Sequence, residues 1–163
     1  MNSHHNIYVI RSAASPWTEP GAAGEELRAV AEVGQEEIRQ VGSRLMEVVT
    51  KPIREVRFAP ANRTRSTALG VIGLTYSSII LQRDERLTSV EPDELKKYLE
   101  AIPAGPTILF THLDVIQSMV EASGSPRPDD ESIPTASLTK FASAPEGLTV
   151  DYIGKTIDQA AKH

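Results

Sequence analysis

Apolar positions along the chain change period several times, and each change predicts a new element. The continuous apolar run Ile7-Tyr8-Val9-Ile10 predicts a strand that is buried on both faces, as in a parallel sheet. Apolar side chains then recur at three- and four-residue steps, which predicts an amphipathic helix over residues 35–50, ended by Pro52. The apolar positions of this helix are Ile38, Val41, Leu45, Val48 and Val49.

Strand and helix patterns continue to alternate through the rest of the chain. In order, we predict a strand at 53–59, a helix from an N-cap at Asn62 through Ala68, Leu69, Ile72 and Ile79, a short strand at 80–83, a helix opened by Glu91-Pro92 and running to Ile102, a strand at 107–110, a helix with Ile116, Met119 and Val120 on one face, and two strands at 138–142 and 148–153. This alternation predicts an α/β layered fold with a mostly parallel sheet. A length of 163 residues fits a single domain, residues 1–163.

Composition narrows the classes of function. With no cysteine, the chain has no disulfide framework, no thiolate zinc site and no cysteine nucleophile. Lys plus Arg is 17 and Asp plus Glu is 22, a net charge of −5 that argues against nucleic-acid binding. No apolar run approaches the roughly 20 residues of a membrane span, and the polar start of the chain does not look like a signal peptide. We therefore expect a cytoplasmic protein, with no metal and no cofactor.

Polar side chains follow several of the predicted strands where each strand ends. Arg11 and Ser12 follow the first strand, Arg63 follows the second, and His112 follows the strand at 107–110. In parallel sheets ligands bind beyond the carboxyl ends of the strands, so these side chains should converge. Arginines, hydroxyls and a histidine suit an anionic, oxygen-rich group such as phosphate. Ser15 either joins this site or caps its own loop.

Three segments in this order resemble motifs of the histidine phosphatase superfamily. Residues 7–17, IYVIRSAASPW, are similar to its opening strand and Arg-His motif; residues 63–68, RTRSTA, resemble its second motif; and residues 107–112, TILFTH, resemble the strand that delivers its second histidine. The resemblance extends over nearly the whole chain and is greatest to the small phosphohistidine-type and ribazole-type phosphatases. It implies a three-layer α/β/α sandwich of the phosphoglycerate mutase-like type. It also implies that Arg11, Arg63 and His112 hold phosphoryl oxygens.

Ser12 stands where that family has its nucleophilic histidine. A serine hydroxyl is a weak nucleophile unless a base takes its proton, and the family's second histidine, here His112, serves the phosphate instead. Three explanations stay open: a divergent protein that keeps the pocket but has lost phosphoryl transfer, a phosphatase whose histidine was replaced to trap substrate, or a different reaction that uses Ser12 or His112. The family's acid is not clearly placed, with Asp84, Glu85 and Glu91 as nearby candidates.

The expected function follows from this pocket and its departure from the family. We expect a phosphatase-like hydrolase site with catalytic positions Ser12 and His112 and substrate-binding positions Arg11, Ser15 and Arg63. Its partner would be a small phosphorylated molecule or a phosphoprotein, as a phosphomonoester or phosphohistidine, and turnover would be lost or strongly impaired. The alternative is a pseudophosphatase that binds a phosphorylated ligand or a partner protein without catalysis.

Overall fold

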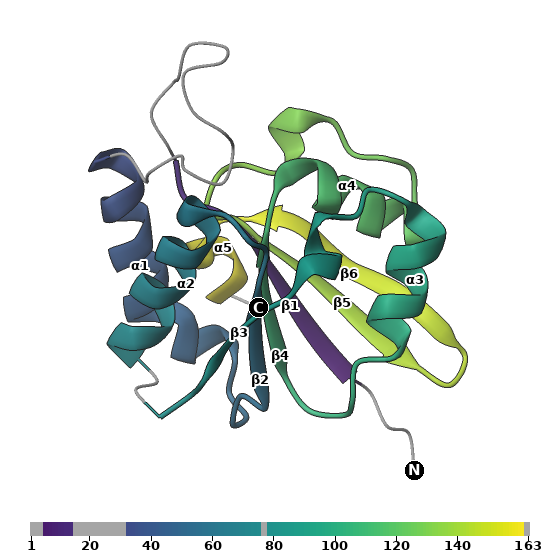
Figure 1. The fold of residues 1–163 in the computed structure, drawn as a ribbon, viewed down its shortest axis with the longest axis horizontal. Helices are drawn as coiled ribbons and strands as arrows, with labels where there is room; N and C mark the ends of the chain where they lie inside the picture. The colour runs from purple at the N-terminus through teal and green to yellow at the C-terminus, as the bar shows by residue number, and fades with distance from the viewer. Residues whose placement is uncertain (1–4, 15–31, 76–77, 162–163) are drawn as a thin grey trace.

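The computed structural model describes residues 5–14, 32–75 and 78–161. Helices and strands alternate along most of the chain, and the last two strands form a hairpin (Figure 1). In chain order the elements are β1 (His5–Arg11), α1 (Glu32–Val48), β2 (Glu55–Phe58), α2 (Asn62–Thr75), β3 (Leu81–Arg83), the 3-10 helix η2 (Glu85–Thr88), α3 (Pro92–Glu100), β4 (Thr107–Thr111), α4 (Leu113–Ala122), the 3-10 helix η3 (Asp130–Ser132), β5 (Leu138–Ala144), β6 (Gly147–Lys155) and α5 (Ile157–Ala161).

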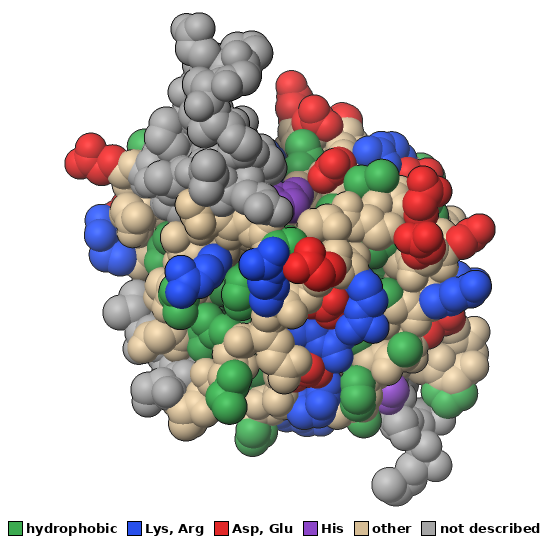
Figure 2. All heavy atoms as spheres, viewed as in Figure 1, with side chains coloured by type: hydrophobic (Ala, Val, Ile, Leu, Met, Phe, Trp, Pro, Cys, Tyr) green, Lys and Arg blue, Asp and Glu red, His purple; other side chains and the backbone are tan. Residues whose placement is uncertain are grey.

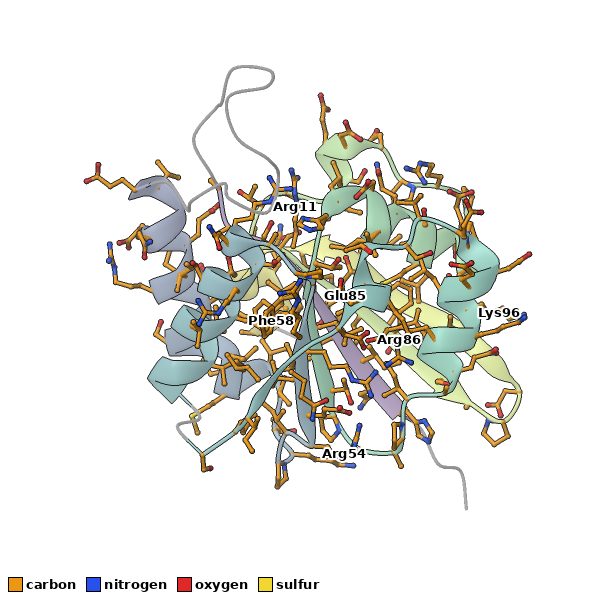
Figure 3. The ribbon with its side chains drawn as sticks, in the orientation of Figure 1. Arg11, Arg54, Phe58, Glu85, Arg86 and Lys96 are labelled. Carbon is orange, nitrogen blue, oxygen red and sulfur yellow. The ribbon has the colours of Figure 1, made fainter. Side chains whose placement is uncertain are left out.

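The described strands form one six-stranded sheet in the order β3-β2-β4-β1-β5-β6. The first four strands in that order are parallel, with β1 and β4 paired from Ile7 opposite Thr107 to Arg11 opposite Thr111. Strand β5 runs antiparallel to both of its neighbours, β1 and β6. The mostly parallel sheet predicted from the sequence is therefore confirmed. Its parallel strands end at one edge, where Figure 3 shows Arg11, whereas Arg54 lies at the opposite edge.

Helices cover both faces of the sheet and make two separate hydrophobic cores. Helices α1, α2 and α5 contribute to the core on one face, and α3 and α4 contribute to the core on the other. Strand β1 serves both cores because alternate side chains point to opposite faces: Tyr8 and Ile10 join the first, and Ile7 and Val9 join the second. This arrangement confirms the predicted three-layer α/β/α sandwich.

Several predicted element boundaries differ from the structure. Helix α2 ends at Thr75, so the prediction that it reaches Ile79 is wrong, although Ile79 still packs against the first core. Leu69, predicted on the apolar stripe, is exposed on the outer side of α2. Asn62 is already inside the helix, because the amide of Arg65 donates to the carbonyl of Ala61, which holds the N-cap position. The short helix α5 was not predicted; at five residues it is too short for apolar periodicity to reveal it.

No helix in the described part of the chain has the length and apolar content that crossing a bilayer requires.

Candidate oxyanion site

The short loop after β1 is held in place by its neighbours at the carboxyl edge of the sheet. The amide of Ser12 donates to the carbonyl of Thr111 in β4 at 3.0 Å. The next amide, of Ala13, donates to the Thr67 hydroxyl at 3.0 Å, and that hydroxyl in turn donates to the carbonyl of Arg63 at 2.6 Å. Ser12 itself is buried. These bonds join β1, β4 and α2, so the loop is preorganised before any ligand arrives.

Arg11 ends β1 with a half-buried guanidinium held on one side by backbone. Its Nη1 donates to the carbonyl oxygen of Ile133 at 2.6 Å, in the segment that precedes β5. Burial lowers the pKa of Arg11, while the nearby carboxylates of Asp130 and Glu37 oppose that change. An arginine starts from so high a pKa that it stays protonated here. The remaining N–H groups of a charged guanidinium can donate to an anion.

Arg63 and His112 meet at the starts of two helices. Arg63 lies in the first turn of α2, His112 is the N-cap residue of α4, and Nη2 of Arg63 is 3.1 Å from Nδ1 of His112. Burial, reinforced by the charge of Arg63, lowers the pKa of His112 to about 4, so the imidazole is neutral at pH 7. Because a guanidinium can only donate, Nδ1 accepts and the ring hydrogen is on Nε2. His112 can therefore donate from Nε2 to an oxyanion.

The electrostatics of this edge favour a bound anion. Burial lowers the pKa of Arg63, and the positive charge of Arg11 lowers it further, so the two guanidinium groups repel each other across the site. The N-terminal ends of α2 and α4 lie at the same edge and add partial positive charge. An anion between Arg11 and Arg63 would relieve this repulsion. Among the described residues, no group of three or more His, Asp or Glu side chains is placed to hold a metal ion.

The lowered pKa of His112 predicts a loss of stability on acidification. The folded-state pKa of about 4 lies below the ordinary value of 6.5, so the unfolded chain binds the proton more readily. The neutral His112 side chain therefore contributes to the free energy of unfolding above pH 6.5. This contribution is lost as the pH falls toward 4, by up to about 3 kcal/mol. Urea unfolding at pH 7 and pH 4.5 should show this loss in the wild type and a smaller one in His112→Asn. An equal loss in both proteins would assign the acid sensitivity to other groups.

The three candidate acids are placed differently by the structure. Asp84 is buried and accepts hydrogen bonds from Arg86, at 3.0 Å to each carboxylate oxygen, and from the Tyr98 hydroxyl at 2.8 Å. Burial alone would raise the pKa of Asp84, but these hydrogen bonds outweigh it and lower the pKa, which is the wrong direction for a proton donor. Glu85 is exposed in η2, beside Arg86 in Figure 3, and pairs with Arg83 at 3.0 Å. Glu91 is the exposed N-cap residue of α3.

The structure thus brings Arg11, Ser12, Arg63 and His112 to one edge of the sheet, while Ser15 and the end of its motif at Trp17 lie outside the described residues. Arg65 is exposed, unlike Arg63 two positions earlier. Two contributing residues, Glu37 and Thr67, were not predicted. Thr67 lies within the matched second motif, so the sequence could have indicated that it contributes to the site. Glu37 could not be predicted in this way, because a polar residue beside the apolar stripe of a helix is usually exposed to solvent.

Comparison with known proteins shows the fold. No protein-family model matches the sequence, and no curated protein matches it. The structure of the protein histidine phosphatase SixA complexed with tungstate superposes with a TM-score of 0.77 at 15% identity, covering 94% of this chain and 98% of that one. Phosphoglycerate mutase from Bacillus anthracis str. Sterne gives 0.77 at 14% identity over 99% and 97%. A mutant phosphoserine phosphatase from Entamoeba histolytica, in complex with phosphoserine, gives 0.72 at 10% identity over 93% of this chain and 98% of that one. At these identities the three comparisons establish a shared fold.

 

Proposed function

We propose that this chain binds a phosphate group between Arg11, Arg63 and His112, and that its phosphoryl transfer is lost or strongly impaired because Ser12 stands at the nucleophile position. The observation that carries the proposal is the Arg63–His112 contact at 3.1 Å, at the sheet edge where β1 delivers Arg11. The similar structures add support, since one holds the tetrahedral oxyanion tungstate and another holds phosphoserine.

Each side chain would have a distinct part in holding the ligand. Arg11 and Arg63 would neutralise a phosphate dianion through charged hydrogen bonds, and the neutral His112 would donate from Nε2. The loop after β1 would keep Ser12 beside the phosphorus, because its backbone is tied to β4 and α2. A phosphomonoester or a phosphohistidine supplies a phosphoryl group of this shape and charge, on a small molecule or on a protein.

One contact favours the non-catalytic alternative, a protein that binds a phosphorylated ligand without turning it over. Nδ1 of His112 already accepts from Arg63, so that nitrogen is not available to take a proton from Ser12. A serine without a base is a weak nucleophile. Binding without turnover is therefore the expected behaviour of the chain as it stands.

Replacing Arg63 should separate a built phosphate site from a diffusely basic surface. We expect Arg63→Ala to weaken binding of inorganic phosphate at least about tenfold, because a charged hydrogen bond is worth roughly 1.5–3 kcal/mol. Arg65→Ala removes the same charge from an exposed position on the same helix and should do much less. Titration calorimetry at fixed salt measures both.

Equal losses in the two variants would mean that the protein attracts anions only through its general charge. No loss in either would place the phosphate site elsewhere and overturn the proposal.

A further inference from the structure

We propose that Glu37 sets the charge preference of this pocket, weakening the binding of dianions more than that of monoanions. The inference rests on the proposed oxyanion site and adds a specificity-determining residue to it. Glu37 lies in α1, outside the three matched motifs that carry Arg11, Arg63 and His112. Its carboxylate is half-buried beside the loop that carries Arg11 and Ser12.

The contacts of Glu37 hold it at the edge of the pocket. Its Oε1 accepts from the amide of Ala14 at 2.8 Å, at the end of the described loop after β1. Its Oε2 accepts from the Thr135 hydroxyl at 2.7 Å, in the segment before β5. Glu37 thus connects two segments that adjoin Arg11. The first is the loop that directly follows Arg11 in the chain, and the second is the segment before β5, whose Ile133 carbonyl accepts from Arg11. A carboxylate fixed at both oxygens cannot swing out into solvent.

The charge of Glu37 acts on the same side of the pocket as Arg11. Burial lowers the pKa of Arg11, and the negative charges of Glu37 and Asp130 oppose that change; the charge of Asp114 opposes the lowering of the pKa of Arg63 and His112 in the same way. Figure 2 shows further acidic side chains over η3, where Asp130 and Glu131 lie. Each negative charge on a ligand is opposed by these carboxylates, so a dianion is opposed about twice as strongly as a monoanion.

Two anions of the same shape separate charge from geometry. Tungstate and perrhenate are both tetrahedral oxyanions of similar size, but tungstate carries two negative charges and perrhenate carries one. A lost hydrogen bond or a displaced loop would weaken the binding of tungstate and of perrhenate by similar factors. Removal of a carboxylate charge instead strengthens the binding of each anion in proportion to the charge that the anion carries.

The test measures both dissociation constants at pH 7.5 for the wild type, Glu37→Gln and Glu36→Gln. A glutamine can accept from the Ala14 amide through its Oε1 and donate from its Nε2 to the Thr135 hydroxyl, so the side chain stays anchored without its charge. We therefore expect about threefold tighter perrhenate and about tenfold tighter tungstate. Glu36 is the matched control: it is the adjacent residue, exposed and paired with Arg39 at 2.6 Å, and its replacement removes the same charge. Glu36→Gln should change either constant by less than about 1.5-fold.

Glu37→Ala also removes the hydrogen bonds, so we expect weaker binding of both anions than in Glu37→Gln, yet the ratio of tungstate to perrhenate affinity should still rise about threefold. An unchanged ratio in both Glu37 variants, with anion binding intact in the wild type, overturns the inference and leaves the proposed function standing. Failure of the wild type to bind either anion overturns the proposed function, and this inference with it.

Discussion

Ser12→His is expected to raise hydrolysis of para-nitrophenyl phosphate at least about a thousandfold. Removing a nucleophile can cost about six orders of magnitude, so restoring one to a preorganised site should recover a large part of that rate. An imidazole nitrogen would attack phosphorus, the bond to the nitrophenolate oxygen would break, and water would then hydrolyse the phosphohistidine. Nitrophenolate needs no proton on leaving, so the substrate does not depend on Asp84, Glu85 or Glu91.

Ser12→Ala is the control and should leave the low rate of the wild type unchanged. Acid-labile, base-stable phosphate on the Ser12→His protein would identify the covalent intermediate. Intact oxyanion binding without any gain in rate would mean that the pocket has diverged beyond the loss of one side chain. That result would favour the non-catalytic alternative.

Gly154→Ala is expected to destabilise the fold by at least about 3 kcal/mol. Gly154 lies in β6 with φ of +61°, and a Cβ there would be 1.8 Å from the carbonyl oxygen of Ser132 and 3.0 Å from Cα of Ile133. The neighbouring atoms are backbone and cannot turn aside. Because the carbonyl of Ile133 holds Arg11, the displaced segment should also weaken anion binding. Urea unfolding measures the first effect.

Gly124→Ala supplies the matched control for this prediction. Gly124 also has a positive φ, +88°, but a Cβ there would meet nothing within 4 Å. Its replacement should cost only the backbone strain, about 1 kcal/mol. Similar losses at the two glycines would mean that the contact with Ser132 does not limit stability.

The sequence by itself determined the layered fold and the residues at its carboxyl edge. The apolar run from Ile7 to Ile10 and the helical period of α1 are local patterns, and local periodicity is what decides strand from helix. Arg11, Arg63 and His112 could be placed together because each follows a strand and parallel strands end at one edge. Ile79 and Leu69 were misplaced because a helix period does not reveal where the helix ends or which side is covered.

Only the tertiary structure decided how those side chains are held and which carboxylates face them. Arg11 is 122 residues from the Ile133 carbonyl that orients it, and Glu37 is 98 residues from Thr135. Asp84 is a poor proton donor because hydrogen bonds from Arg86 and Tyr98 lower its pKa, and these contacts exist only in the folded structure. Contacts of this kind leave no period in the sequence, because each depends on where the packing of the two cores brings distant loops together.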